Sequence, residues 1–155
     1  MFARIVGLER LNDVRSDDDH RSALSGASRG KPHLVMGFAH DTRSPRRARA
    51  AIGGFLDDPY DPIAPDVILV ASELVSNVVR HTNVGGTLRV WDPKPDVPLR
   101  LEVADDDPNL PRAVTPHDGG GRGLHIVHEV SDAWGSEREG VGKVIWVEFD
   151  RSQRP

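Results

Sequence analysis

The sequence predicts an α+β fold, a two-layer sandwich with helices on one face of a mainly antiparallel mixed sheet. Three observations support this class. Apolar residues recur at helical spacing in three segments, and five other segments are compatible with strands. The predicted strands mostly follow one another in pairs, unlike the regular strand–helix alternation of a parallel sheet. A chain of 155 residues gives one domain a substantial core but is short for two domains.

The folded domain is expected to span residues 31–151, followed by a short tail at 152–155. Residues 1–30 are predicted to form a flexible leader, because 16–28 is rich in Asp, Ser, Gly and Arg and poor in apolar residues. Some apolar residues near the start of this leader could still dock on the domain as a short strand or turn: Phe2, Ile5, Val6 and Leu8.

The domain is predicted to begin with a strand and a helix. Residues 33–39 are compatible with a strand. Ser44 followed by Pro45 is a typical helix start, with the serine as N-cap and the proline as the first helical residue. The next apolar residues recur at helical spacing, and Asp57-Asp58-Pro59 ends that helix.

The longest helical pattern begins after Asp61-Pro62, near Pro65, and is expected to end at His81 or Thr82. Its spacing predicts an amphipathic helix packed on the sheet. The apolar residues form one broad face: Val67, Ile68, Val70, Ala71, Leu74, Val75 and Val78.

The second half of the chain changes from a helical period to alternation. Residues 87–91 and 99–103 are predicted to form two half-buried strands. Residues 134–139 and 143–149 are predicted to close the sheet as an antiparallel pair around Gly140–Gly142.

A long loop and a third helix separate these two strand pairs. Residues 105–121 contain three prolines and three glycines and show almost no apolar periodicity. Helical spacing resumes at Leu124 and continues to Val130. A loop of this length inside a small domain is usually functional.

Charge and composition exclude several classes of function. Twenty Lys and Arg against 24 Asp and Glu give a formal net charge of −4, which favours neither nucleic acid nor an anionic membrane as partner. The chain has no cysteine, which excludes disulfides, thiolate metal sites and a cysteine nucleophile. The sequence shows no signal peptide and no apolar run long enough to span a bilayer, so we expect a cytoplasmic protein.

Glu73 and Asn77 are four residues apart on the longest predicted helix and therefore share a face. The amide oxygen of an asparagine suits Mg²⁺, and a glutamate can accept a proton from a hydroxyl or a water. Two solvated positions on the edge of an amphipathic helix would give the same pattern. The pair alone therefore leaves both interpretations open.

Asp105 stands where the apolar strand 99–103 runs into the long loop. A carboxylate at a strand end is rigidly placed and can accept a hydrogen bond from the exocyclic amine of a base. It is also the first of three consecutive aspartates before Pro108, and alone it fits an ordinary turn.

A glycine-rich turn, Gly119 to Gly123, precedes the third helix. Glycines let the backbone approach a ligand closely, and a helix N-terminus offers free N–H groups to an anion, a combination that suits phosphates. A flexible hinge would have the same composition. Neither a Walker A loop nor a dinucleotide fingerprint is present, because Gly142-Lys143 is followed by Val144 and no βαβ unit surrounds the glycines.

Taken together, these motifs resemble the Bergerat-fold (GHKL) ATPase superfamily of histidine kinases, gyrase, the Hsp90 chaperone and mismatch-repair ATPases. Glu73–His81 resembles the N box, Val103–Pro108 the first glycine box and Gly121–Leu124 the second. Within the superfamily, residues 33–150 are most similar to the compact anti-sigma-factor serine/threonine kinases of bacteria. Three further runs match that branch in order and spacing: Asn109–Pro111, Trp134-Gly135 and Gly142–Trp146.

The resemblance implies a role for each matching residue. Asn77 would hold Mg²⁺ on the phosphates of ATP, and Glu73 would be the general base that activates a serine or threonine hydroxyl of a partner. Asp105 would bind the adenine amine. The second glycine box would form the hinge and helix start of the ATP lid, with a phosphate contact from its arginine: Gly121, Arg122, Gly123 and Leu124.

Two positions depart from the family pattern. Asp107 stands where the first glycine box usually has Gly or Ser, and its carboxylate could repel phosphate or merely face water. Val144 occupies the place of a hydroxyl residue that often lies near the adenine. Both departures bear on nucleotide affinity and on rate.

The resemblance implies a kinase that phosphorylates an anti-anti-sigma (STAS-type) partner and sequesters a sigma factor, in a branch where homodimers are common. Asp107 and Val144 keep a second class open, an ATP-binding module that captures its partner without significant kinase activity. A third hypothesis, a histidine kinase fragment, is based on His40–Pro45, which looks like a phospho-acceptor box. The residues between His40 and Glu73 leave room only for the ATPase domain's own first helix and a linker, so His40 is expected to end the first strand.

His125 and His128 are three residues apart on the last predicted helix and could share a metal ion. No third ligand is evident nearby in the sequence, so surface positions are expected.

Overall fold

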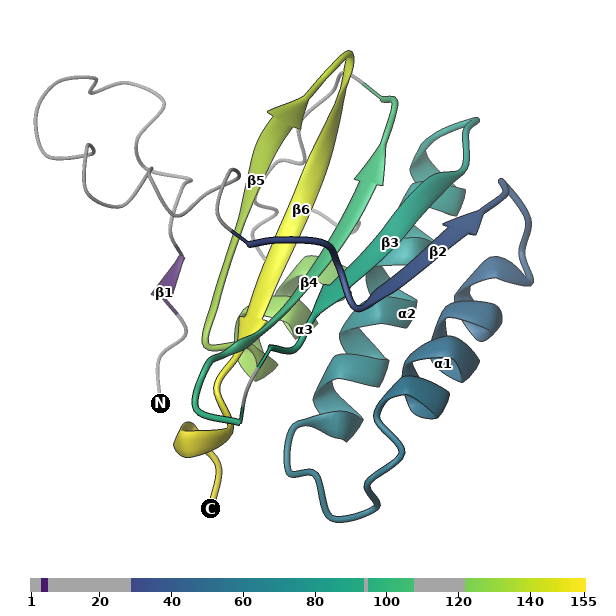
Figure 1. Cartoon of the computed structure of the whole chain (residues 1–155). Helices are drawn as coiled ribbons and strands as arrows, with labels where there is room; N and C mark the ends of the chain where they lie inside the picture. Colours follow the sequence, from purple (N-terminus) through teal and green to yellow (C-terminus); the bar gives the residue numbers. More distant parts are fainter. Residues whose placement is uncertain (1–3, 6–28, 94, 108–121) are drawn as a thin grey trace, which may run out of the picture.

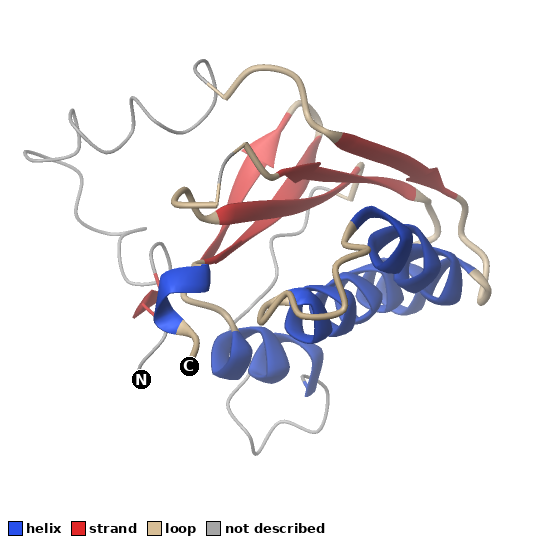
Figure 2. Cartoon of the chain, turned by 60° about the horizontal axis from the view of Figure 1, so that its bottom comes forward, coloured by secondary structure: helices blue, strands red, loops and turns tan. Residues whose placement is uncertain are grey.

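The sheet is built from six strands, and three helices lie on one of its faces (Figures 1 and 2). A computed structural model of the chain describes residues 4–5, 29–93, 95–107 and 122–155. The elements are β1 (Arg4–Ile5), β2 (Leu34–Phe38), α1 (Ser44–Phe55), α2 (Ala64–His81), β3 (Gly86–Trp91), β4 (Leu99–Asp105), α3 (Arg122–Val130), β5 (Ala133–Glu139), β6 (Gly142–Phe149) and a 3₁₀ helix (Arg151–Gln153).

The strand order is β1-β5-β6-β4-β3-β2, and all neighbours are antiparallel except β1 and β5. The predicted α+β class is therefore confirmed, including a mixed but mainly antiparallel sheet with the helices on one face. β1 lies within the predicted leader, where Arg4 and Ile5 pair in parallel with Ala133 and Trp134. Such a short strand was one of the two ways in which the leader was expected to dock.

The start of α1 corrects one prediction. Ser44 is the first helical residue and Pro45 follows it, but the serine does not act as the N-cap. Its buried hydroxyl donates a 2.7 Å hydrogen bond to the carbonyl of Ala39. Asp41 instead accepts from the backbone N–H of Arg43 at 2.7 Å. The serine fastens the incoming chain to the helix because the turn after β2 brings the Ala39 carbonyl within reach.

α2 is the central helix and packs against α1, α3, β3 and β4. Pro65 lies in its first turn, and Arg80 and His81 lie in its last, where positive charge and donors suit the helix dipole. The predicted apolar face of α2 is buried, except that Ile68 is only half-buried at its edge. Ala64 and Ser72 are buried as well. Among the helices that the structure describes, none combines the length and apolarity needed to cross a bilayer.

The register of β4 and β6 divides their side chains between two faces. Leu101 pairs with Val147 and Val103 with Ile145, and these residues belong to the hydrophobic core beneath the helices. The alternating positions point to the opposite face, because successive side chains of a strand alternate. There Arg100 lies over the Trp146 ring, 4.5 Å from its centroid.

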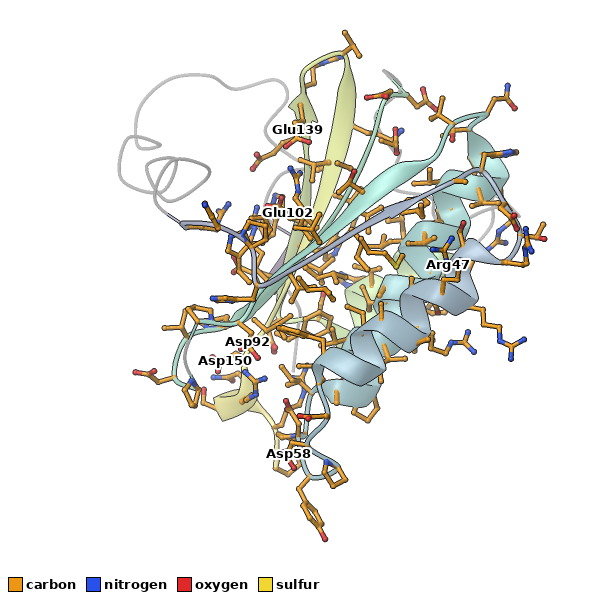
Figure 3. The ribbon with its side chains drawn as sticks, turned by 45° about the vertical axis from the view of Figure 1, so that its right-hand side comes forward. Arg47, Asp58, Asp92, Glu102, Glu139 and Asp150 are labelled. Atoms are coloured by element: carbon orange, nitrogen blue, oxygen red, sulfur yellow. The ribbon has the colours of Figure 1, made fainter. Side chains whose placement is uncertain are left out.

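Charged residues occupy the sheet face opposite the helices, where Glu102 and Glu139 project together (Figure 3). Arg89 reaches both carboxylates, at 3.2 Å from Glu102 and 2.8 Å from Glu139. Arg100 contacts Glu102 at 2.9 Å and Glu148 at 3.1 Å. One face of the sheet is thus apolar and covered by the helices, and the other is charged. Only strand residues on the covered face can belong to a site beneath the helices.

Candidate functional site

The chain topology brings the predicted motifs toward one end of the sheet. Asp105 ends β4 and pairs with Gly86, the first residue of β3, which follows the C-terminal end of α2. β4 and β5 both run antiparallel to β6, so they share a direction, and the connecting helix α3 runs back along the sheet. The N box and Asp105 therefore lie toward one end of the sheet, and the second glycine box opens the helix that connects this end to the start of β5.

Glu73 and Asn77 lie in the C-terminal half of α2, half-buried at the margin of its apolar face. Ile68 marks the side of α2 that faces α1, because its side chain lies against Gly53 of α1. On α2, Glu73 is about 140° around the helix axis from Ile68. The two polar residues therefore lie on the side of α2 away from α1. Within the described parts of the chain, neither side chain makes a hydrogen bond or an ion pair. No described residue therefore stands between either side chain and a ligand.

Asp105 lies on the helix-covered face of the sheet, where it is 7% exposed. Its Oδ1 atom accepts a 2.8 Å hydrogen bond from the backbone N–H of Asp107 and faces the ammonium of Lys143 at 3.0 Å. Lys143 is the register partner of Asp105 on β6, so the two side chains emerge side by side from the same face. The strand-end carboxylate is as rigidly placed as the sequence predicted.

The two expected departures from the family pattern have different explanations in the structure. Asp107 turns its carboxylate toward Lys143, with Oδ2 at 3.7 Å from the ammonium, so it faces a cation rather than open water. Val144 pairs with Ala104 and lies on the opposite face of the sheet from Asp105. Val144 therefore does not lie beside Asp105, and Lys143 does.

Lys143 is the residue beside Asp105 that the sequence analysis did not single out. One signal could have identified it. In 143–149 the odd-numbered positions are Lys143, Ile145, Val147 and Phe149, so the lysine shares its face with three apolar core residues. A lysine in line with core positions needs a buried anionic partner, and Asp105 holds the equivalent place at the end of β4.

Gly142 fixes the close approach of β6 to Asp105. A Cβ atom there would come within 1.8 Å of the Asp105 carbonyl oxygen and 2.6 Å of the Asp106 Cα, both backbone atoms. At Gly86 on the other side of β4, a Cβ would lie 2.3 Å from the Ala104 carbonyl oxygen. Glycines on both flanks therefore let the neighbouring strands hold the end of β4 in place.

The second glycine box is described only in part. Arg122 and Gly123 are the first two residues of α3, which confirms that the box leads into a helix, one turn or less ahead of the predicted start at Leu124. Leu124 is half-buried and packs against the core. Gly121 lies outside the described residues, as does the rest of the long loop from 108.

A hollow of about 630 Å³ adjoins Asp105, but it does not connect the predicted ligands. Its walls include Thr87, Arg89 and Glu139, which belong to the face of the sheet opposite the helices, and neither Glu73 nor Asn77 lines it. The site suggested by the motifs lies on the other side of β4, between the sheet and α2.

The remaining candidates carry no metal chemistry. In the described parts of the chain, no three His, Asp or Glu residues lie close enough to share a metal ion, so His125 and His128 have no third ligand there. His125 is exposed and His128 half-buried. His40 is exposed in the turn two residues beyond the end of β2.

The residues present fit an adenine nucleotide with Mg²⁺. Asp105 offers a buried carboxylate whose second oxygen, Oδ2, takes no hydrogen bond from any residue that the structure describes. Asn77 offers an amide oxygen, a neutral hard ligand of the kind that Mg²⁺ accepts. The second glycine box opens α3, and the N-terminus of a helix is a kind of site that suits phosphates.

Comparison with known proteins identifies the family of the chain. The family described as histidine kinase-, DNA gyrase B-, and HSP90-like ATPase matches residues 63–153, a stretch that contains every predicted site residue. Among solved structures, the chain is similar to the histidine kinase domain from Erythrobacter litoralis EL346 blue-light activated histidine kinase. The identity is 19%, the TM-score 0.49, and the alignment covers 86% of this chain and 70% of that chain. No curated protein matches the chain.

Proposed function

The chain belongs to the histidine kinase-, DNA gyrase B- and HSP90-like ATPase family, and we propose that it is an ATP-dependent protein serine/threonine kinase. Its substrate in this proposal is a serine or threonine of an anti-anti-sigma (STAS-type) partner, and the same protein sequesters a sigma factor. The family assignment supports ATP-dependent phosphotransfer or ATPase chemistry in general. The choice of a hydroxyl acceptor depends on the site residues of this chain.

The observation that carries the proposal is the position of Glu73 one helical turn before Asn77, with neither residue engaged in the described part of the chain. Other carboxylates of the fold, such as Glu102 and Asp61, are bound by arginines. A half-buried glutamate without a partner, next to a ligand for Mg²⁺, is suited to accept a proton during phosphoryl transfer.

The chemistry requires little from the protein beyond positioning and charge stabilisation. Bound Mg²⁺ would supply neutralisation of the phosphate charge, and Asn77 is the residue that would hold it. Asp105 fixes the base end of the nucleotide. The hydroxyl oxygen of the partner forms a bond to the γ-phosphorus while the bond to the bridging oxygen breaks and ADP leaves. Glu73 takes the proton from that hydroxyl.

The partner class is supported by sequence similarity rather than by the site. Trp134-Gly135 and Gly142–Trp146 resemble anti-sigma-factor kinases, and these runs form parts of β5 and β6. A net charge of −4 gives no reason to replace the protein partner with nucleic acid.

An ATP-binding capture module is the second candidate. It was suggested by Asp107 and Val144, which depart from the family pattern. In the structure, Asp107 faces Lys143 and Val144 lies on the other sheet face, so both departures have explanations that leave phosphotransfer intact. These contacts favour the kinase over the capture module.

The test is incubation with labelled ATP, Mg²⁺ and a STAS-type partner. We expect acid-stable phosphate on a serine or threonine of the partner and a loss of about a hundredfold or more in rate for Glu73→Gln, the size typical of a lost general base. Glu129→Gln is the matched control, because Glu129 is exposed on α3 and lies outside the proposed site. It should retain the wild-type rate.

Other outcomes select the alternatives. Partner capture that persists in Glu73→Gln, without transfer by the wild type, supports the capture module. Acid-labile phosphate on the protein itself, lost in His40→Gln, supports the histidine kinase fragment.

A further inference from the structure

Lys143 is a buried cation that the phosphotransfer chemistry above does not use. Its side chain is 9% exposed, and its ammonium lies beside the carboxylate assigned to the base of the nucleotide. Burying an ammonium is costly unless its hydrogens are satisfied, so the number of partners it has is informative.

In this pair, one N–H of Lys143 and one carboxylate oxygen of Asp105 make no hydrogen bond to any described residue. The ammonium has three N–H donors. One reaches Asp105 Oδ1 at 3.0 Å and a second reaches the carbonyl oxygen of Asp107 at 3.4 Å. The third faces Asp107 Oδ2 at 3.7 Å, an ion-pair contact that is longer than a hydrogen bond. Among the described residues, no donor reaches Asp105 Oδ2. The pair therefore presents an open acceptor beside an N–H that makes no hydrogen bond to a described residue.

Adenine has the complementary edge. Its N6 amine donates a hydrogen bond, and the neighbouring N1 accepts one. We propose that Lys143 is a base-reading residue, and that it donates to N1 of the adenine while Asp105 accepts from N6. The inference rests on the proposed nucleotide site and adds to it the residue that selects the base.

The same arrangement disfavours the other purines. Guanine presents two adjacent donors, N1–H and the N2 amine, but Asp105 has one free oxygen because Oδ1 is already engaged by Lys143 and Asp107. One guanine N–H would stay unpaired in a buried site. Hypoxanthine presents an acceptor at position 6 and a donor at position 1, the reverse of adenine, and both contacts would be lost in the same pose.

The test measures nucleotide affinity rather than activity. Calorimetry with Mg²⁺ compares ATP, 1-deaza-ATP, in which C–H replaces N1, and ITP. For the wild type we expect 1-deaza-ATP to bind about tenfold to a hundredfold more weakly than ATP, the usual value of a hydrogen bond to a charged group. ITP should lose at least as much. In Lys143→Met, ATP and 1-deaza-ATP should bind alike. Lys31→Met, at an exposed lysine, is the matched control and should keep the wild-type ratio.

The outcomes separate the two proposals. Equal affinity of the wild type for ATP and 1-deaza-ATP overturns the role of Lys143 and leaves the nucleotide site standing, and this result requires no variant to fold. An ATP preference that survives unchanged in Lys143→Met overturns it as well. Wild-type protein that binds neither nucleotide overturns the proposed function together with the inference.

Discussion

Single residues hold together parts of this chain that are far apart in sequence, and Arg151 is the clearest case. Its guanidinium donates to Asp61 and to Asp92, each at 2.8 Å, across 90 and 59 sequence positions. It thus joins the segment before α2 to the segment after β3, and Asp92 lies at the end of the molecule near the C-terminal 3₁₀ helix (Figure 3). The hydrogen bonds that Arg151 donates to Asp92 and Asp61 in turn raise its pKa.

The Arg151 contacts predict a pH-dependent loss of stability. Burial alone would raise the pKa of Asp61, but the hydrogen bonds from Arg151 and from the Ile63 N–H lower it below its usual value. A carboxyl with a lowered folded-state pKa contributes stability above the unfolded value of about 3.9 and loses it as the pH falls further. Arg151→Met should therefore cost about 1 to 3 kcal/mol in the free energy of unfolding at pH 7.

Urea unfolding at pH 7 and at pH 3 measures this effect, and the gap between wild type and Arg151→Met should narrow in acid. Arg46→Met, at an exposed position of α1, is the control and should change stability little at either pH. A penalty for Arg151→Met that is the same at both pH values would contradict the assignment of the contact to an ionised Asp61.

Gly142 is a second residue whose effect is local and specific. Its Cβ would collide with the backbone of Asp105 and Asp106, so Gly142→Ala must move the end of β4 or the start of β6. We expect lower ATP affinity together with lower stability, by about 1 to 3 kcal/mol, a size typical of overpacking a well-packed position. Calorimetry and denaturant unfolding give the two readings. Unchanged ATP affinity in a stably folded Gly142→Ala would show that the position of Asp105 does not matter for binding.

At the scale of an element, the β5–β6 hairpin depends on its tight turn. Glu139 pairs with Gly142, which leaves Gly140 and Val141 as the connection, and Gly140 has φ of 59°. Glycine adopts positive φ without a Cβ penalty, which is why a two-residue hairpin favours it. The hairpin matters for function because β6 carries Lys143 to Asp105.

Gly140→Ala should destabilise the protein by about 1 kcal/mol, the usual cost of a non-glycine residue at positive φ. Gly37→Ala is the matched control, because φ there is not positive and a Cβ would meet nothing within 4 Å. It should be neutral or slightly stabilising, since alanine restricts the unfolded chain. The midpoint of thermal unfolding compares the two. An equal effect of both substitutions would remove the turn geometry as the cause.

At the scale of the whole molecule, the proposed site would draw on three separate elements: α2, the end of β4 and the start of α3. A ligand that bridges them stabilises the folded state, because the unfolded chain cannot present the three together. At a nucleotide concentration 100 times the Kd, the gain is about 2.7 kcal/mol. Thermal unfolding should therefore shift upward by several degrees with Mg²⁺ and ATP.

The same experiment separates the ligand residues. Asn77→Ala should lose the part of the shift that needs Mg²⁺, and Asp105→Asn should weaken ATP binding with and without the metal. Calorimetry on the three proteins checks the affinities directly. If wild type, Asn77→Ala and Asp105→Asn all behave alike, the nucleotide site is wrong.

Much of the fold could be predicted because it depends on local periodicity. The alternation in 87–91 and 99–103 and the helical spacing after Pro65 each identified an element whose bounds the structure reproduces to within a few residues. Ser44 was misassigned because the partner of its hydroxyl, the Ala39 carbonyl, is set by the path of the preceding turn and not by the helix motif. A local sequence pattern predicts the structure of one segment, but it does not predict which groups of other segments lie beside it.

The sequence by itself determined the fold class and the order of the elements, and it singled out Glu73, Asn77 and Asp105 as candidate site residues, because periodicity and motif spacing are properties of the chain alone. Only the tertiary structure decided that Lys143, and not Val144, lies beside Asp105. The reason is strand register. A shift of one residue in the pairing of β6 with β4 would turn every β6 side chain to the opposite face of the sheet. Lys143 and Asp105 are 38 positions apart in the sequence, so no local pattern fixes this pairing. The pairing of the Lys143 ammonium with the Asp105 carboxylate is therefore fixed by the register of the folded sheet.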